Sequence, residues 1–134
     1  MTDGGWFGGL ARLVPLRRIV DSRGALLPLE FDALPFVPKR VVVIHEVPAQ
    51  AIRGGHGHRS GRQLLVCIHG AVRVRMARPP ETAAVTLVPG GPGLLIEAGV
   101  WAEQSYEGED AALLMLASEP YDPAAYFFEP GDAR

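Results

Sequence analysis

The chain has 134 residues, of which 48% are hydrophobic and 21% are charged. This balance is that of an ordinary globular protein and excludes a disordered chain, a collagen and a coiled coil. The net charge of −2, without a long run of like charges, argues against a nucleic-acid partner. The single cysteine, Cys67, excludes an internal disulfide and a zinc site built from thiolates.

The length fits one domain, since typical domains hold about 100–150 residues. We expect a single domain over residues 1–134, with a loosely ordered start over about residues 1–10. In that N-terminal segment the basic residues follow the apolar ones, the reverse of the order in a secretory signal. No apolar run approaches the ~18 residues of a membrane-spanning helix. We therefore predict a cytoplasmic protein with no membrane and no nucleic-acid partner.

Short runs of apolar residues recur along the chain, and each ends at Gly, Pro or Asp. They cover residues 12–20, 25–31, 39–47, 63–68, 71–76, 84–88, 93–97 and 111–117. Short strands at near-regular spacing, without a long helical pattern, predict an all-β fold, either an antiparallel barrel or a sandwich.

The middle of the chain predicts a hairpin over Gln63–Met76. His69 and Gly70 separate two apolar runs there, and glycine supplies the positive φ of a two-residue turn. We expect His69 to be a turn residue and Cys67 to be inert core. A short irregular or helical tail is expected over Pro123–Phe128, with Asp122 as its cap.

The most informative segment is Arg53-Gly-Gly-His56-Gly-His58, followed by Gln63. Residues two apart in a strand share a face, so both histidines would point into the barrel. The glycines would leave space around them. Imidazoles titrate near neutral pH, so the pair could act as acid and base. A purely structural pair is the alternative interpretation.

The segment that contains the histidines resembles the first motif of the cupin superfamily: Gly-His-x-His, then four residues, Gln63, six residues and Gly70. A later segment resembles the second cupin motif: Gly91, five residues, Glu97-Ala98-Gly99, two residues and Ala102. The resemblance implies a single-domain, jelly-roll-like barrel. In metal-binding cupins, a glutamate ligand stands at the position of Gln63 and a histidine ligand at that of Ala102. Two of the four ligand positions therefore carry residues other than the usual metal ligands, and we expect no bound metal.

An ordered set of blocks carries a narrower resemblance, over about residues 19–128. The blocks are Asp21-Ser22-Arg23-Gly24, Leu34-Pro35-Phe36, Lys39-Arg40-Val41, the histidine segment, residues 63–67, Gly93-Leu94, Val100-Trp101, Leu116-Ala117-Ser118, Tyr121-Asp122 and Tyr126. They are similar to the sugar-nucleotide 3,4-ketoisomerase family of cupins. The resemblance implies a substrate of the dTDP-4-keto-6-deoxyglucose type, whose keto group moves from C4 to C3 without metal or organic cofactor, in deoxyamino-sugar biosynthesis. A related sugar-nucleotide epimerase and a non-catalytic sugar-nucleotide-binding cupin are the alternatives.

For this chemistry we expect His58 as the main base and His56 as its partner, although the residues leave open which is acid and which is base. Arg53 and Gln63 are candidates to stabilise the enediolate oxygen. Arg23 and Arg40 are candidates for the diphosphate, since guanidinium groups suit phosphate oxygens. Arg62 and Arg75 are weaker candidates for that role.

Two further residues are expected at the sugar pocket. Trp101 would line it. Val42, Val43 and Ala102 replace polar groups that are common in the family, and His45, on the strand face of Val43, would fill part of the space. The same departures leave the configuration of the product at C4 open. Tyr121 and Tyr126 are expected to pack rather than react.

We also expect a homodimer. A small barrel has sheet edges that invite pairing with a second copy, and the family resemblance suggests the same state. Exchange of the N-terminal strands is one arrangement that would produce it.

Overall fold

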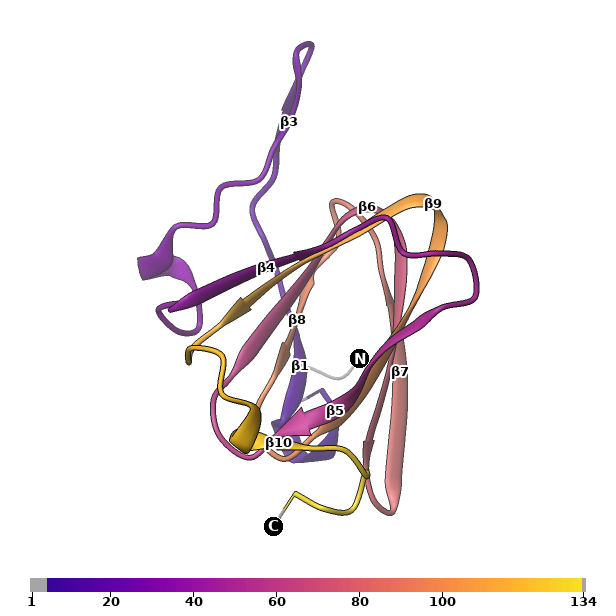
Figure 1. Cartoon of the computed structure of the whole chain (residues 1–134). Coiled ribbons are helices and arrows are strands. Elements are labelled where there is room, and N and C mark those ends of the chain that lie inside the picture. The colour runs from indigo at the N-terminus through magenta and orange to yellow at the C-terminus, as the bar shows by residue number, and fades with distance from the viewer. Residues whose placement is uncertain (1–4, 134) are drawn as a thin grey trace.

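The computed structural model describes residues 5–133 and is built almost entirely from antiparallel strands (Figure 1). The elements in chain order are η1 (Phe7–Gly9), β1 (Ala11–Val14), β2 (Ile19–Asp21), β3 (Gly24–Leu26), η2 (Phe31–Ala33), β4 (Arg40–Ile44), β5 (Ile52–His58), β6 (Gln63–Arg78), β7 (Glu81–Leu87), β8 (Gly93–Ile96), β9 (Trp101–Ala117), η3 (Pro123–Ala125) and β10 (Tyr126–Phe127). The strand order is β1-β8-β6-β9-β5-β10, with β4 also pairing β9 and β7 also pairing β6. The predicted all-β class is confirmed.

The long strands β6 and β9 pair from Gln63↔Ala117 to Ala77↔Trp101, and the sheet curls around them. The predicted turn at His69-Gly70 is therefore wrong. Gly70 does have a positive φ of 69°, but it sits at a register shift inside β6, where a bulge rather than a turn takes up the unusual backbone. The reversal comes later, between the paired residues Arg78 and Glu81.

The curled sheet buries apolar side chains on both faces. Along β6, Leu65 and Cys67 belong to the cluster inside the curl, and Leu64 and Val66 belong to a second cluster on the outer face. The outer cluster is covered by apolar residues that come before β4 in the chain, including Leu16, Leu27, Leu29, Leu34 and Phe36. Cys67 is buried, as predicted, and burial raises the pKa of its thiol.

Both ends of the domain depart from expectation. Phe7 is buried in the inner cluster and Trp6 pairs with Ala11, so the prediction of a loosely ordered start is wrong for residues 5–10; residues 1–4 lie outside the described part of the chain. The tail begins with a single 3₁₀ turn, in which the Asp122 carboxylate accepts a hydrogen bond from the Ala124 N–H at 3.0 Å. Asp122 is therefore the cap that was predicted, while β10 was not expected.

The hairpin β2–β3 forms a separate two-stranded sheet that projects from the barrel (Figure 1). Its apolar side chains are exposed: Val20 shows 63% of its surface and Leu26 shows 59%. Within residues 5–133, no helix is long and apolar enough to cross a membrane.

Candidate active site

Two neighbouring cavities open at the end of the barrel where the chain finishes. The first, of about 170 Å³, is walled by β4, β5, β6, β8 and β9 and contains both histidines; we call it the histidine cavity. The second, of about 250 Å³, lies between β4, the β5–β6 connection and the tail; we call it the tail cavity. The two share a boundary made of Arg40, His58, Gly61, Gln63 and Tyr126.

His56 and His58 both line the histidine cavity, as their spacing on one strand predicted. Their ring centres lie 5.3 Å apart and the rings meet edge to face, at 73°. The glycine between them has a different role from the one expected. A Cβ on Gly57 would lie 2.2 Å from Cζ of Phe127, so Gly57 makes room for that ring rather than for the imidazoles.

Gly54 shapes the strand just before the histidines. Its φ is +84°, and the β5–β9 register shifts between Gly54 and His56. A Cβ there would also lie 3.0 Å from the Ala102 carbonyl oxygen. The left-handed backbone favours glycine and the close approach leaves little room for a Cβ, and the resulting bulge sets where β5 turns its histidines inward.

Burial keeps both imidazoles neutral at neutral pH. Burial lowers the pKa of His58 from 6.5 to about 4, and the positive charges of His56 and Arg40 add to the effect. Burial also lowers the pKa of His56, against a backbone hydrogen bond at Gly54 that raises it. A neutral imidazole has a free nitrogen, so each ring can accept a proton, and the acid it then becomes is strong enough to return that proton readily.

Gln63 lies directly against the second histidine. Its Nε2 is 3.1 Å from Nδ1 and 3.0 Å from Nε2 of His58. An amide N–H in this position donates to whichever ring nitrogen carries no proton, and it restricts the orientation of the ring. The first residue of β6 thus completes the wall between the two cavities.

Two of the predicted cationic residues reach the histidine cavity. Arg40 enters from β4 and Arg53 from β5. The guanidinium of Arg40 lies 5.0 Å from the ring centre of Tyr121, which places it at the boundary with the tail cavity. Arg62 lines the tail cavity, but its guanidinium forms a double contact with the Glu97 carboxylate at 2.8 and 2.9 Å. Arg62 is therefore committed to a partner within the protein.

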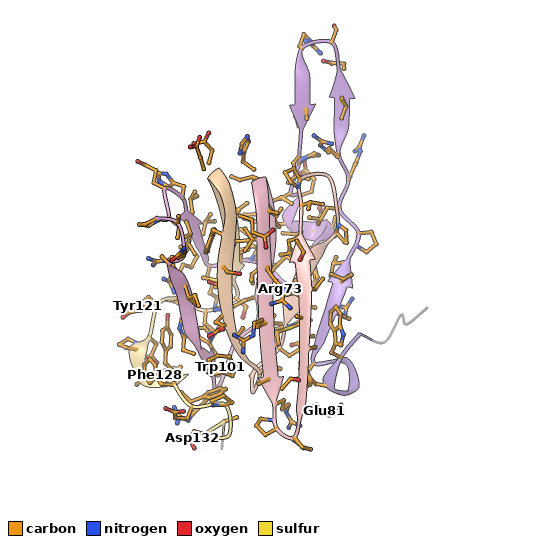
Figure 2. All side chains as sticks on the ribbon, turned by 90° about the vertical axis from the view of Figure 1, so that its right-hand side faces the viewer. Arg73, Glu81, Trp101, Tyr121, Phe128 and Asp132 are labelled. Carbon is orange, nitrogen blue, oxygen red and sulfur yellow. The ribbon has the colours of Figure 1, made fainter. Side chains whose placement is uncertain are left out.

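Three predicted site residues lie elsewhere. Arg23, on the projecting hairpin, is 89% exposed at its side chain and pairs with Asp21. Trp101 faces outward, and its Nε1–H donates to the Phe128 carbonyl at 3.0 Å (Figure 2). His45 lies beside Glu46 at the surface.

The alternation of β4 explains the wrong prediction for His45. The residues of β4 that line the histidine cavity are Arg40, Val42 and Ile44. Val43 is exposed on the other face, so a histidine two residues further on lies outside too. Of the two valines in this strand that depart from the family, only Val42 affects the cavity.

Tyr126 is the site residue that sequence reasoning missed. Its ring stacks on His56, with centres 4.5 Å apart and planes within 6°, and it meets His58 edge to face at 4.5 Å. It was expected only to pack. The contact depends on the pairing of β10 with β5, and a two-residue strand leaves too short a pattern for sequence to indicate.

Comparisons with known proteins identify the family of this chain. The family model FdtA, described as WxcM-like, C-terminal, matches residues 10–132, so the chain belongs to this family. A curated relative, the TDP-4-oxo-6-deoxy-alpha-D-glucose-3,4-oxoisomerase of Aneurinibacillus thermoaerophilus, is 33% identical over 86% of this chain and 84% of its own.

Two solved structures are similar over most of their length. A histidine-to-asparagine mutant of the 3,4-ketoisomerase QdtA from Thermoanaerobacterium thermosaccharolyticum, in complex with TDP-4-keto-6-deoxyglucose, is 35% identical with a TM-score of 0.85, over 90% of this chain and 88% of that one. The WlaRB TDP-quinovose 3,4-ketoisomerase from Campylobacter jejuni is 32% identical with a TM-score of 0.81, over 89% and 92%. The cupin-like fold and the predicted family are both confirmed.

Proposed function

We propose that this protein is a 3,4-ketoisomerase that acts on dTDP-4-keto-6-deoxyglucose or a close analogue. The observation that carries the proposal is the pair of partly buried, neutral imidazoles, His56 and His58, in one cavity of a chain from this family. The curated relative and the solved structures bear isomerase names of the same reaction class.

The reaction needs only proton transfers. The C3–H bond lies next to the C4 carbonyl, and His58 removes that proton while the electron pair forms the C3–C4 double bond of an enediolate. Arg53 or Gln63 stabilises the charge that collects on the oxygen at C4. The O3–H proton then passes to the oxygen at C4, and a proton is delivered to C4 as the C3–C4 double bond gives up its electron pair and the carbonyl forms at C3. His56 carries the second proton transfer.

The donor set in the histidine cavity supports chemistry without a metal. Besides the two imidazoles, the cavity is lined by one carboxylate, Glu97, and that carboxylate is held by Arg62. The amide of Gln63 is a poor ligand for iron or zinc, which typically take three or more imidazole, carboxylate or thiolate donors. Stoichiometric iron, zinc or manganese retained through dialysis would contradict this part of the proposal.

The tail cavity is suited to the nucleotide end of the substrate. It adjoins the histidine cavity at Arg40, whose guanidinium faces both. Arginine pairs with phosphate oxygens through two parallel N–H bonds. With the sugar at the histidines, Arg40 holds the diphosphate at the boundary, and the nucleoside extends along the tail.

The protein acts as a homodimer in this proposal, with the β2–β3 hairpin as part of the interface. The hairpin exposes Ile19, Val20 and Leu26, a set of apolar side chains that a second copy would cover. Exposed edges and apolar ribbons favour pairing between copies. In such a dimer, we place Arg23, which lies at the turn of the hairpin, near the substrate of the second copy.

The product identifies the reaction. Purified protein is incubated with dTDP-4-keto-6-deoxyglucose and the product is examined by ¹³C and ¹H NMR. A carbonyl carbon at C3 supports the proposal. An inverted centre with the ketone still at C4 would show an epimerase, and binding without any change in the sugar would show a non-catalytic module.

A further inference from the structure

The C-terminal tail is fastened directly to the strand that carries the histidines. In β10, Tyr126 pairs with His58 and Phe127 pairs with Gly57. The Arg59 N–H donates to the Ala125 carbonyl at 2.7 Å. On the far side the Trp101 indole holds the Phe128 carbonyl, and Figure 2 shows these two residues together at the end of the barrel where the tail lies. The tail thus behaves as one more strand of the active-site wall.

The direction of Phe127 decides the direction of Tyr126. Phe127 is only 1% exposed and fills the space left by Gly57. Successive side chains of a strand point to opposite faces, so Tyr126 must turn the other way, toward the imidazoles. Its ring then lies flat on His56 and edge-on to His58, and it lines both cavities.

We infer that Tyr126 is a positioning residue for the acid–base pair: its ring holds His56 in one orientation and shields both imidazoles from water on the tail side. This inference rests on the proposed isomerase function. The contact fixes ring geometry at the place where two protons move, and a misplacement of about 1 Å can reduce a rate by roughly 10²-fold. Tyr126→Leu, which removes the ring, should therefore lower kcat by about 10-fold to 100-fold with a smaller change in KM.

The shielding makes a separate prediction about titration. Since burial is the main cause of the lowered imidazole pKa values, opening the tail side should raise them toward the ordinary value near 6.5. The titratable groups around the pair are Arg40 from β4, Arg53 from β5, Glu97 after β8, Arg62 before β6, and Glu119, Tyr121, Asp122 and Tyr126 from the tail. The β6 and β9 residues in the histidine cavity are uncharged. Only the ring of Tyr126 changes in the variant, so the shift in the imidazole pKa values should follow from lost burial.

The test uses imidazole NMR spectra of the wild-type protein, Tyr126→Leu and Tyr126→Phe, together with steady-state kinetics from pH 4 to 9. In the wild type the ring protons of His56 should be shifted upfield by the stacked ring, relative to those of His45 and His69, which serve as internal references because their side chains lie at the surface. Tyr126→Phe keeps the stack, so it should retain the upfield shift, the low pKa values and most of kcat. Tyr126→Leu should lose all three and move the acidic limb of the kcat profile to higher pH.

Two results would overturn the inference. One is a wild-type His56 signal whose ring protons show no upfield shift relative to those of His45 and His69, a comparison that does not depend on the folding of any variant. The other is a folded Tyr126→Leu protein with unchanged imidazole pKa values and unchanged kcat. If the wild type were inactive on the keto sugar, the proposed function would fail, while the NMR comparison would still decide whether Tyr126 holds and shields the pair.

Discussion

The β2–β3 hairpin and the C-terminal tail are both short segments with apolar side chains, but they have opposite surroundings. Phe127 of the tail is almost completely buried, whereas Val20 of the hairpin is mostly exposed. The tail pairs with β5 of its own barrel, and the hairpin forms its own small sheet away from the barrel. The tail therefore completes the cavity of its own chain, whereas the hairpin exposes an apolar surface that we assign to the proposed homodimer interface.

Local sequence explains much of this difference. The tail meets a strand with a free edge and a glycine, Gly57, that gives its phenylalanine a place to enter. The hairpin is followed by Leu27, Leu29, Leu34 and Phe36, which cover the outer face of the sheet. That face is therefore already occupied near the hairpin, and β2 and β3 extend beyond it. Changes on the tail side should affect chemistry, and changes on the hairpin side should affect association.

The largest effect should come from His58→Asn. Removal of a general base typically costs about 10²- to 10⁴-fold in rate, so exchange of the substrate C3 proton with solvent should fall by roughly 10³-fold, as followed by ¹H NMR. The folded state should persist, and so should the proposed dimer, because the imidazole lies away from the hairpin. Exchange at the wild-type rate would remove His58 from the role of base.

The second-largest effect should come from the double variant Val20→Asp and Leu26→Asp in the hairpin, which should weaken self-association. Each change puts a carboxylate where burial of an apolar side chain contributes about 1.5 kcal/mol or more, so together they should weaken self-association by about 100-fold or more. Sedimentation velocity should then show a 14.4 kDa monomer at concentrations where the wild type is a dimer. A wild-type protein that is itself monomeric at micromolar concentration would contradict the proposed role of the hairpin.

Gly57→Ala should separate the tail from the barrel. The added Cβ would lie 2.2 Å from Phe127 Cζ and 2.6 Å from the Val100 carbonyl oxygen, and overpacking of this kind typically costs about 1–3 kcal/mol. The melting temperature should drop, and the stacking signal of Tyr126 on His56 should weaken. Gly131→Ala is the matched control, since its Cβ would meet nothing within 4 Å and it should melt like the wild type.

The last prediction concerns the dependence of stability on pH. The pKa of His58 is about 4 in the folded protein and close to 6.5 in an unfolded chain, so between these values the unfolded state binds more protons. The free energy of unfolding should therefore be highest above pH 6.5 and decrease as the pH falls toward 4. Thermal melts should show a weaker pH dependence in His58→Asn; equal pH dependence in the two proteins would mean that His58 is not the group responsible.

Several features were predictable because they depend on local spacing. The shared face of His56 and His58 follows from alternation, and the family blocks around them indicated the cupin fold. The prediction that His45 lies in the pocket was wrong because alternation tells which residues share a face of a strand but not which face is inside the barrel. The prediction that Trp101 lines the pocket was wrong for the same reason, since its neighbour Ala102 lines the cavity and Trp101 therefore lies on the other face.

Other features depend on contacts between distant segments. The His69-Gly70 pair has the composition of a turn, but pairing of β6 with β9 on both sides of it keeps the chain extended. Tyr126 reaches the histidines only through β10–β5 pairing across 68 residues of chain. Gly57 was expected to leave space around the imidazoles, but it makes room for Phe127, whose ring reaches it only through the β10–β5 pairing.

The assignment of acid–base chemistry to the histidine cavity can be tested with dTDP-4-keto-6-deoxyglucose in deuterated buffer, with ¹H and ²H NMR of the sugar. The wild-type protein should yield a ketone at C3 and deuterium at C4, because the proton delivered to C4 comes from imidazoles that exchange with solvent. Recovery of the sugar with its ketone at C4 and no deuterium at C3, under conditions where the protein binds it, would contradict this chemistry.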